Sequence, residues 1–320
     1  MKRLVIISGI ILLAIIIFAG VALVRFDKSP DELRARYGGD ASSYLFLPSG
    51  AVAHYRDQGN REGPPLVLIH GSNSSLHAWE PWVERLGERF RLITVDMPGH
   101  GLTGTTPADD YSQEGMVAFL EEFTEGLNLE HFALGGNSMG GGISLLYALE
   151  NPGAVTALVL VSSGGMPRTG EEDTPLVFRL ASIPVIRDIL SYILPRSLVE
   201  DGLKHSIEDD ALVTGEMIDR YYDLSLYPGN RRATMARFAS YADREPLDSR
   251  LGELRIPALI LWGEKDNLIP VASAHAMKQA LPDAELVIYN DIGHVAMEEI
   301  PDESAAAVQT FLLEQNLSGK

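Results

Sequence analysis

The sequence of 320 residues has no cysteine and few basic residues. Without cysteine the chain can form no disulfide, offers no thiolate to a metal and has no cysteine nucleophile. Its 26 Lys and Arg are outnumbered by 44 Asp and Glu, which gives a formal net charge of −18. Because no basic stripe offsets this excess, the composition argues against a nucleic-acid partner and disfavours docking of the domain on anionic lipid.

Two kinds of site motif are also missing from the sequence. No glycine-rich loop has the spacing that holds a nucleotide phosphate. No histidine and carboxylate residues are grouped at the spacing of a metal site. We therefore expect neither a cofactor nor a metal ion.

Charge is absent from one long stretch, Leu4 to Val24, which is almost wholly apolar. At about 1.5 Å per residue a helix of this length spans roughly 30 Å, the thickness of a bilayer core. A cleaved signal peptide is the alternative, but its apolar region is shorter, about 7–15 residues. Lys2 and Arg3 favour a cytoplasmic N-terminus. We predict an uncleaved transmembrane anchor in residues 1–25, with the domain that follows on the extracytoplasmic side.

The rest of the chain alternates short apolar runs with amphipathic stretches, which is typical of a buried parallel sheet covered by helices. Residues 25–44 are interpreted as a linker or short helix before this domain. Strands are predicted at residues 51–56, 66–69, 92–95, 132–134, 157–161, 258–263 and 285–289. Helices are predicted at residues 77–86, 112–127, 143–149, 274–280 and 301–314.

The segment from Gly136 to Gly140 has the sequence G-N-S-M-G, between an apolar run and a helical pattern. This arrangement is typical of a strained strand-to-helix turn with Ser138 at its tip. Glycines suit the turn because a Cβ would collide where strand and helix cross closely. The helix that begins after Ser138 offers the amide of Met139 to a developing oxyanion. An ordinary glycine-rich turn is the alternative interpretation.

Asp266 and His294 each follow the end of a predicted strand, as Ser138 does. Since the carboxyl ends of parallel strands share one edge of a sheet, we expect these three residues to converge. A serine hydroxyl needs a neighbouring base, and His294 can take its proton and later return it. Asp266 would orient the imidazole and stabilise its charged form. Glu264 and Asp291 are the alternative acids.

The order serine, acid, histidine and five motifs resemble the α/β-hydrolase fold family, in its branch of lipases, esterases and carbon–carbon hydrolases. The matching motifs are His70-Gly71, Asp96-Met97-Pro98-Gly99-His100-Gly101, Gly136-Asn137-Ser138-Met139-Gly140-Gly141, Trp262-Gly263-Glu264-Lys265-Asp266 with Pro270, and Gly293-His294 with Glu298. The resemblance covers about residues 44–315. It implies an α/β-hydrolase fold, with a mostly parallel central sheet, helices on both faces and a helical lid. In this chain one N-terminal transmembrane helix would precede it.

The same resemblance implies a catalytic triad of Ser138, Asp266 and His294, because the family places its acid in the loop that contains Asp266. It also implies an oxyanion hole made by the backbone amides of Ser72 and Met139.

The loop after residue 69 contains the second oxyanion amide and a histidine that is not expected to be catalytic. Asn73 is the alternative to Ser72 as the second oxyanion amide. His70 is expected to brace this loop rather than to act as a base. Asp96 and His100 look like a catalytic pair, but the proline and glycines around them indicate a structural turn.

Strand–helix alternation stops from about residue 166 to 255, where the pattern is mostly helical and rich in large apolar residues. We interpret this stretch as a lid inserted between two strands, with additional core helices as the alternative. The predicted organisation is an anchor (1–25), a first part of the core (26–165), the lid (166–255) and a second part of the core (256–320).

These features predict a membrane-anchored serine hydrolase that cleaves a small ester with an apolar acyl group through an acyl-enzyme. Residues 4–24 would hold it in the membrane, an arrangement similar to membrane-bound monoacylglycerol lipases. The apolar lid favours an apolar substrate. Haloalkane dehalogenases and epoxide hydrolases are disfavoured because they place an aspartate where this chain has Ser138.

Two alternatives remain. The Gly-Asn-Ser-Met-Gly-Gly string also resembles the meta-cleavage-product hydrolases, which cleave a carbon–carbon bond in a dienoic keto acid. That reaction needs a cation for the substrate carboxylate, but most arginines in or near the lid are interpreted as solvated: Arg168, Arg179, Arg187, Arg231, Arg232 and Arg237. A non-catalytic binding protein on the same scaffold is the other alternative, disfavoured because no triad residue is missing.

Overall fold

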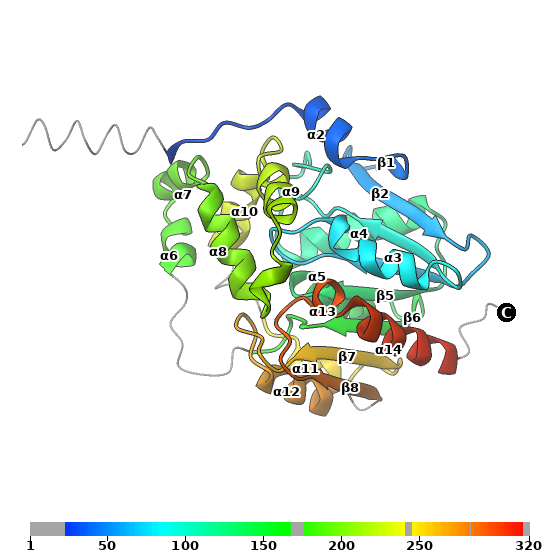
Figure 1. Ribbon diagram of the computed structural model, residues 1–320. Coiled ribbons are helices and arrows are strands. Elements are labelled where there is room, and N and C mark those ends of the chain that lie inside the picture. The colour runs from blue at the N-terminus through cyan, green and yellow to red at the C-terminus, as the bar shows by residue number, and fades with distance from the viewer. Residues whose placement is uncertain (1–22, 168–175, 241–244, 282, 316–320) are drawn as a thin grey trace, which may run out of the picture.

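The computed structural model describes residues 23–167, 176–240, 245–281 and 283–315. An eight-stranded sheet lies at the centre, with helices on its faces and further helices stacked along one end (Figure 1). The strand order is β1-β2-β4-β3-β5-β6-β7-β8. The strands are β1 (Ser42–Phe46), β2 (Val52–Gly59), β3 (Pro65–Ile69), β4 (Arg91–Val95), β5 (Phe132–Asn137), β6 (Val155–Val161), β7 (Ala258–Gly263) and β8 (Ala284–Tyr289).

The sheet is parallel from β4 to β8 and antiparallel at its first edge. Strand β2 pairs antiparallel with both β1 and β4, and the remaining neighbours are parallel. This confirms the predicted mostly parallel sheet. Strand β1 was not predicted, because its Ser-Ser-Tyr-Leu-Phe sequence is half-buried at the edge and gives little apolar signal. The helix α2 (Pro30–Tyr37) precedes it, as one of the two interpretations of residues 25–44 expected.

Helices cover both faces of the sheet. On one face Phe119 of α4, Ile143 of α5 and Met277 of α12 lie in one apolar core. On the other face Trp82 of α3 and Phe311 of α14 lie in a second core. These helices are α3 (Glu80–Leu86), preceded by the 3-10 turn Leu76–Trp79, α4 (Gln113–Gly126), α5 (Met139–Glu150), α12 (Ala272–Ala280), α13 (Ala296–Glu299) and α14 (Pro301–Glu314).

Strand β6 shows why the central strands have continuously apolar sequences. Leu158 and Leu160 face the first core, while Val159 and Val161 face the second. Because successive side chains of a strand point to opposite faces, a strand covered on both sides must be apolar at every position. Burial of such side chains contributes about 1.5–3 kcal/mol each. The sheet edge that carries the site is therefore rigidly held.

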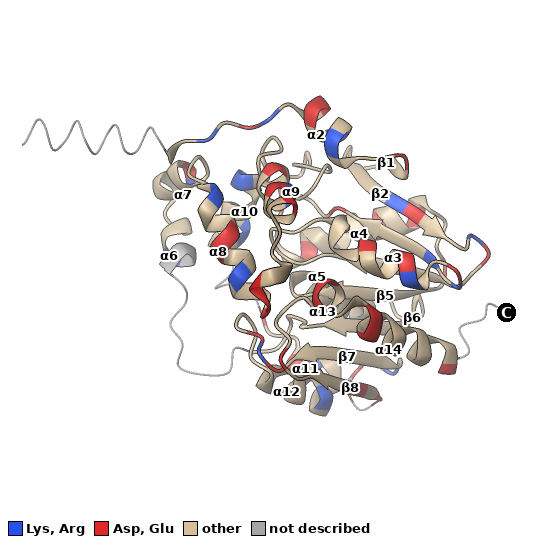
Figure 2. Ribbon diagram, viewed as in Figure 1, with Lys and Arg blue, Asp and Glu red and all other residues tan. Residues whose placement is uncertain are grey.

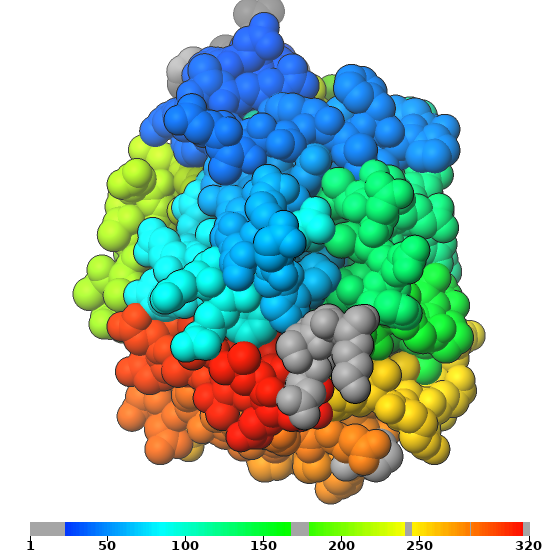
Figure 3. All heavy atoms as spheres, turned by 90° about the vertical axis from the view of Figure 1, so that its right-hand side faces the viewer, coloured from blue at the N-terminus to red at the C-terminus, as the bar shows by residue number. Residues whose placement is uncertain are grey.

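A helical segment is inserted between β6 and β7, on the side of the molecule away from the C-terminal end (Figure 1). Its helices are α6 (Leu176–Ala181), α7 (Pro184–Leu190), α8 (Arg196–Ser206), α9 (Gly215–Ser225), α10 (Asn230–Ala239) and α11 (Asp248–Leu251), with a 3-10 turn at Asp210–Leu212. We call α6 to α10 the lid. Seen from the side away from the lid, most of the surface belongs to the sheet and its covering helices, with α14 in red, and yellow-green lid residues appear only at the left margin (Figure 3).

The predicted anchor at residues 4–24 lies, except for its last two residues, outside the described part of the chain. Within the described ranges no helix is long and apolar enough to cross a bilayer. Charged side chains of both signs are scattered over helices and loops, while the central strands carry few (Figure 2).

Candidate active site

Ser138 occupies a strained turn between β5 and α5. Its backbone angles are φ 53° and ψ −114°, a region that residues other than glycine rarely adopt. A Cβ on Gly136 would lie 2.3 Å from the carbonyl carbon of Gly140, so the turn closes only with glycine there. As the first residue of α5, Met139 has an amide with no partner within the helix. This is the turn that the G-x-S-x-G motif predicts.

Three other loops converge on this turn. The side-chain amide of Asn137 donates to the backbone carbonyl of His294 over 3.1 Å. The amide of Gly164, after β6, donates to the carbonyl of Ser138 over 2.8 Å. A Cβ placed on Gly71, after β3, would lie 3.4 Å from the Cβ of Ser138. The structure thus brings the ends of β3, β5, β6 and β8 together.

Asp266 and His294 form a buried pair. His294 Nδ1 lies 2.8 Å from Asp266 Oδ2, and the amides of Leu268 and Ile269 donate to Asp266 Oδ1 over 2.8 and 2.9 Å. Burial raises the pKa of Asp266, but the His294 hydrogen bond and charge with the two amides hold it below its usual value. The carboxylate therefore stays ionised and fixes the tautomer of His294.

The two alternative acids do not share this position. Glu264 is exposed and lies 3.9 Å from Lys265 Nζ, and Asp291 is exposed at a turn with φ 54°. Asp266 is the acid that the structure joins to His294.

Glu299 holds the loop that carries His294. Its carboxylate accepts from the amide of Gly293 over 3.1 Å and from that of Glu208 over 2.9 Å. Burial raises the pKa of Glu299, and the backbone amides oppose that rise. The amide of His294 in turn donates to Ser206 O over 2.7 Å, so α8 of the lid contacts this loop.

The sequence reasoning missed Glu299 and pointed to its neighbour. Glu298, the residue included in the family motif, binds Arg220 over 3.0 Å and the hydroxyl of Tyr221 over 2.7 Å. Two adjacent glutamates in the short helix α13 give the same sequence signal, and only the fold shows which of them faces the histidine loop.

The loop after β3 carries the predicted oxyanion residues Ser72 and Asn73 at the surface. The buried side chain of His70 stabilises this loop by two hydrogen bonds. The imidazole donates from Nδ1 to Gly71 O over 2.7 Å, and its Nε2 accepts from the amide of Met97 over 3.1 Å. Burial lowers the pKa of His70, which keeps the ring neutral and able to make both bonds.

Asp96 stabilises the turn after β4. It pairs with His54 Nδ1 over 2.7 Å and accepts from the amides of Leu76 and Leu102, each over 2.8 Å. Burial alone would raise the pKa of Asp96, but the hydrogen bond and charge of His54 hold it well below its usual value. These contacts are those of a structural carboxylate, the role that the sequence predicted.

Arg237 on α10 connects the lid to the predicted oxyanion loop. It is 2% exposed. Its guanidinium lies 2.8 Å from His100 Nε2, and donates to Ser72 Oγ over 2.7 Å and Asn73 Oδ1 over 3.1 Å. Of the arginines in or near the lid, most of which were expected to be solvated, Arg237 and Arg231 are buried. The sequence could not single out these two, because helical periodicity cannot reveal a partner more than a hundred residues away.

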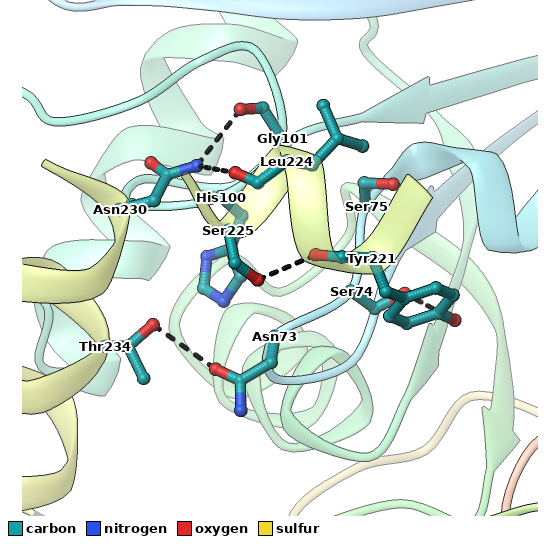
Figure 4. A pocket seen from close by; sticks show the side chains of 11 residues that line it. Asn73, Ser74, Ser75, His100, Gly101, Tyr221, Leu224, Ser225, Asn230 and Thr234 are labelled. Atoms are coloured by element: carbon teal, nitrogen blue, oxygen red, sulfur yellow. Dashed lines mark hydrogen bonds between the residues drawn. The ribbon is translucent and has the colours of Figure 1, made fainter. Parts of the chain in front are cut away.

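A small polar pocket lies beside this loop, between the turn at residues 99–101 and the lid (Figure 4). Its walls are Asn73, Ser74, Ser75, Gly99, His100, Gly101, Tyr221, Leu224, Ser225, Asn230 and Thr234. Asn73 and Thr234 meet across it, with Thr234 Oγ1 donating to Asn73 Oδ1 over 3.2 Å. None of Ser138, Asp266 and His294 lines this pocket.

Metal ligation has no support in the described ranges of the chain, where no group of three or more His, Asp or Glu is placed to hold an ion. The site that the structure describes consists of the turn at Ser138, the buried pair of His294 and Asp266, and the loop after β3.

The chain resembles known proteins over most of its length. A model of the alpha/beta hydrolase fold family matches residues 64–301. Lipase 1 of Psychrobacter immobilis is 29% identical over 311 residues, 90% of this chain and 87% of the relative. A 2-hydroxy-6-oxo-2,4-heptadienoate hydrolase of Pseudomonas putida is 28% identical over 259 residues, 78% of this chain and 88% of the relative.

A solved structure also matches along almost the whole chain. It is that of a bacterial membrane phospholipase A, with a TM-score of 0.75 and 24% identity, covering 99% of each chain. This likeness concerns the fold. Together with the strand order, the nucleophile turn and the family match over residues 64–301, it places the protein: the chain belongs to the α/β hydrolase fold family.

Proposed function

We propose that this protein is a serine hydrolase that cleaves carboxylic esters with an apolar acyl group. Ser138 is the proposed nucleophile, His294 the base and Asp266 the acid that orients it. The observation that carries the proposal is the buried pair of His294 and Asp266, joined through Asn137 to the strained turn that holds Ser138.

The proposed reaction proceeds in two halves. His294 Nε2 takes the proton of Ser138 as its Oγ attacks the ester carbonyl, and the amides of Ser72 and Met139 stabilise the oxyanion. The C–O bond to the alcohol breaks, and His294 returns the proton to the leaving alkoxide. Water then attacks the acyl-enzyme with His294 again as base, which releases the acid and restores Ser138.

The preference for an apolar acyl group is supported by the lipase relative and by the apolar lid sequence. Burial of each CH₂ group contributes about 0.8 kcal/mol, so acyl chain length is expected to affect kcat/KM steeply. A rate that is equal for short and long acyl chains would contradict this part of the proposal.

We further propose that residues 4–24 anchor the protein in a membrane, with the catalytic domain on the extracytoplasmic side. The apolar length of the segment and the basic residues Lys2 and Arg3 support this topology. Full-length protein should remain in the pellet after alkaline extraction of membranes. In intact cells the domain should be accessible to an added protease. Release at high pH would contradict the anchor, and protection from the protease would contradict the orientation.

Hydrolysis of a carbon–carbon bond is the second candidate. The relative from Pseudomonas putida is named for such a reaction, and the buried guanidinium of Arg237 beside Ser72 is a cation that could meet a substrate carboxylate. Turnover of a dienoic keto acid in the absence of any ester hydrolysis would favour this candidate.

The test of the leading proposal is hydrolysis of p-nitrophenyl esters from short to long acyl chains by the full-length protein in detergent. Ser138→Ala should lower kcat on the order of 10⁴-fold or more. Ser144→Ala is the matched control, because Ser144 lies on the same helix, is buried, and its hydroxyl donates within the helix to Gly140 O over 2.8 Å. Equal activity of Ser138→Ala and wild type would exclude the serine mechanism.

A further inference from the structure

Apolar side chains are exposed in one region of the lid. Among the described residues eleven large apolar side chains are exposed, and seven of them lie in residues 23–26 and 183–198. The first stretch is where the described chain begins, and the second spans α7 and the start of α8. Single exposed apolar residues are ordinary, but a group of them marks a surface that contacts something apolar.

The exposed side chains on and after α7 follow a helical stripe. Val185, Ile189 and Tyr192 are spaced by four and three residues, and they are 70%, 57% and 52% exposed. Val185 and Ile189 therefore lie on one face of α7, and Tyr192 lies in the turn that follows the helix. Helix α7 has no buried residue among Pro184–Leu190, so its apolar stripe faces outward. We call Val185, Ile189 and Tyr192, with Phe26, the lid stripe.

The chain enters the domain directly beside this stripe. Val24 forms a β-bridge with Ile193, and the amide of Arg25 donates to Tyr192 O over 2.8 Å. Arg231 on α10 donates to Arg25 O over 2.7 Å, which ties the entering segment to the lid. In Figure 1 the described chain begins next to α7, on the side away from the C-terminal end.

The position of this entry point limits what can cover the stripe. The apolar sequence from Leu4 ends at Val24, the residue that bridges to Ile193. If that sequence spans a bilayer, the chain leaves the membrane at Val24, which is paired with the residue that follows Tyr192. The membrane surface then lies next to the lid stripe. Phe26, 78% exposed, continues the apolar surface from the entry point.

The charges on α7 indicate which lipid surface fits. Arg187 and Asp188 lie side by side on the helix, with Nε and Oδ1 3.8 Å apart, so α7 carries no net charge. The whole chain has a net charge of −18, which repels anionic headgroups. Contact would therefore depend on apolar insertion rather than on charge, as for helices that lie in a membrane interface.

We propose that the lid stripe rests in the interface of the bilayer that holds the anchor, and that zwitterionic lipid is its partner. The lid is then a second membrane contact, held at a fixed place by the strap of residues 24–27. This inference rests on the anchor in the proposed function, but not on the proposed chemistry. It sets the lid, rather than the face formed by α14, toward the membrane.

The absence of cysteine makes a direct test simple. Val185→Cys and Ile189→Cys each create a single labelling site for an environment-sensitive fluorophore in the full-length chain. Leu313→Cys is the matched control, because Leu313 is also an exposed apolar residue, 49% accessible, but lies on α14. The labelled proteins are reconstituted into phosphatidylcholine vesicles, and flotation confirms that the chain is membrane-bound.

Labels at positions 185 and 189 should shift their emission to the blue in vesicles and lose intensity when the lipids carry a quenching group. The label at 313 should do neither. If the chain floats but all three labels keep the emission they show in water, the lid stripe does not contact the bilayer, and only the anchor is supported. If the chain does not float, both are wrong.

A second copy of the chain is the competing occupant of the stripe. In that case labels at 185 and 189 would be shielded in detergent as well as in vesicles. They would also quench one another as protein concentration rises, without an effect of the lipid quencher. That result would show that the lid stripe contacts a second copy of the chain rather than lipid, and would overturn the proposal.

Discussion

Asp266 is held at three points, by His294 and by two backbone amides. In the proposed mechanism this fixed carboxylate keeps the proton of His294 on Nδ1 and leaves Nε2 free to act as base. Asp266→Asn would favour the wrong tautomer. We expect kcat for ester hydrolysis to fall about 10⁴-fold with the fold intact.

Glu264→Gln is the matched control for that prediction, since Glu264 lies two residues earlier, is exposed and pairs only weakly with Lys265. Steady-state kinetics of both variants and circular dichroism of each provide the measurement. A loss in Glu264→Gln as large as that in Asp266→Asn would show that the acid has been assigned to the wrong residue.

The sequence predicted that Ser138, Asp266 and His294 converge, because each follows an apolar strand and parallel strands bring their carboxyl ends to one edge. The structure pairs His294 with Asp266 and links His294 through Asn137 to the turn of Ser138. The sequence did not predict Glu299 or Arg237. Arg237 acts on a loop more than 160 residues away, and Glu299 joins the nearby Gly293 to the distant Glu208. Glu298 and Arg232, on the same two helices, carry the same side chains as Glu299 and Arg237. Which of two like residues faces a loop depends on helix rotation, which is set by packing and not by local pattern.

At the scale of single elements, the turn from β5 to α5 depends on close backbone contact. A Cβ on Gly136 would be 2.3 Å from backbone atoms of Gly140, whereas one on Gly202 in α8 would meet nothing within 4 Å. Gly136→Ala should lower the free energy of unfolding by about 2–4 kcal/mol. Gly202→Ala, the control, should raise it by about 0.5–1 kcal/mol. Urea unfolding followed by fluorescence measures both, and equal effects would contradict the crossing geometry.

Helix α10 offers a similar comparison between two arginines. Arg237 is buried against His100, Ser72 and Asn73, while Arg232 makes an exposed ion pair with Asp109. Arg237→Met should release the predicted oxyanion loop, and a displacement of about 1 Å near the reacting atoms costs up to about 10²-fold in kcat. Arg232→Met should change stability by less than about 1 kcal/mol and leave kcat unchanged.

Separate values of kcat and KM decide what Arg237 does. A fall in kcat at constant KM for esters indicates a positioning residue. A rise in KM confined to substrates with a carboxylate would instead assign Arg237 to substrate binding, as the carbon–carbon candidate requires. No change in either constant would show that the contact between lid and loop is irrelevant to turnover.

The sequence was least informative about two elements, the edge strand β1 and the lid helix α7. The central strands were found because both faces are buried, so every residue is apolar. Strand β1 at the sheet edge lacks that constraint, with Tyr44 and Leu45 only half-buried and Phe46 exposed. The lid was recognised by the loss of strand–helix alternation, but the sequence pattern alone gave no sign that α7 turns its apolar stripe outward.

The whole molecule contains several buried histidines, and they contribute to the dependence of its stability on pH. Burial, and the charge of Arg56, lower the pKa of His77 from 6.5 to about 4. Burial likewise lowers the pKa of His70, and that of His100 falls well below its usual value. These rings are neutral in the folded protein over a range in which they would bind protons in the unfolded chain.

The direction of the pH effect follows from proton linkage. Between pH 6.5 and about 4 the unfolded state binds more protons at His77 than the folded state, so the free energy of unfolding decreases as the pH falls. The contribution of His77 alone is about 3 kcal/mol across that window. We expect the free energy of unfolding, measured with urea, to fall steadily below pH 6.5. In His77→Gln its slope against pH should be smaller by about the contribution of one bound proton. Identical slopes in His77→Gln and wild type would mean that this ring takes up its proton at the same pH in the folded and unfolded states, despite its contacts with Arg56 and Tyr37 O.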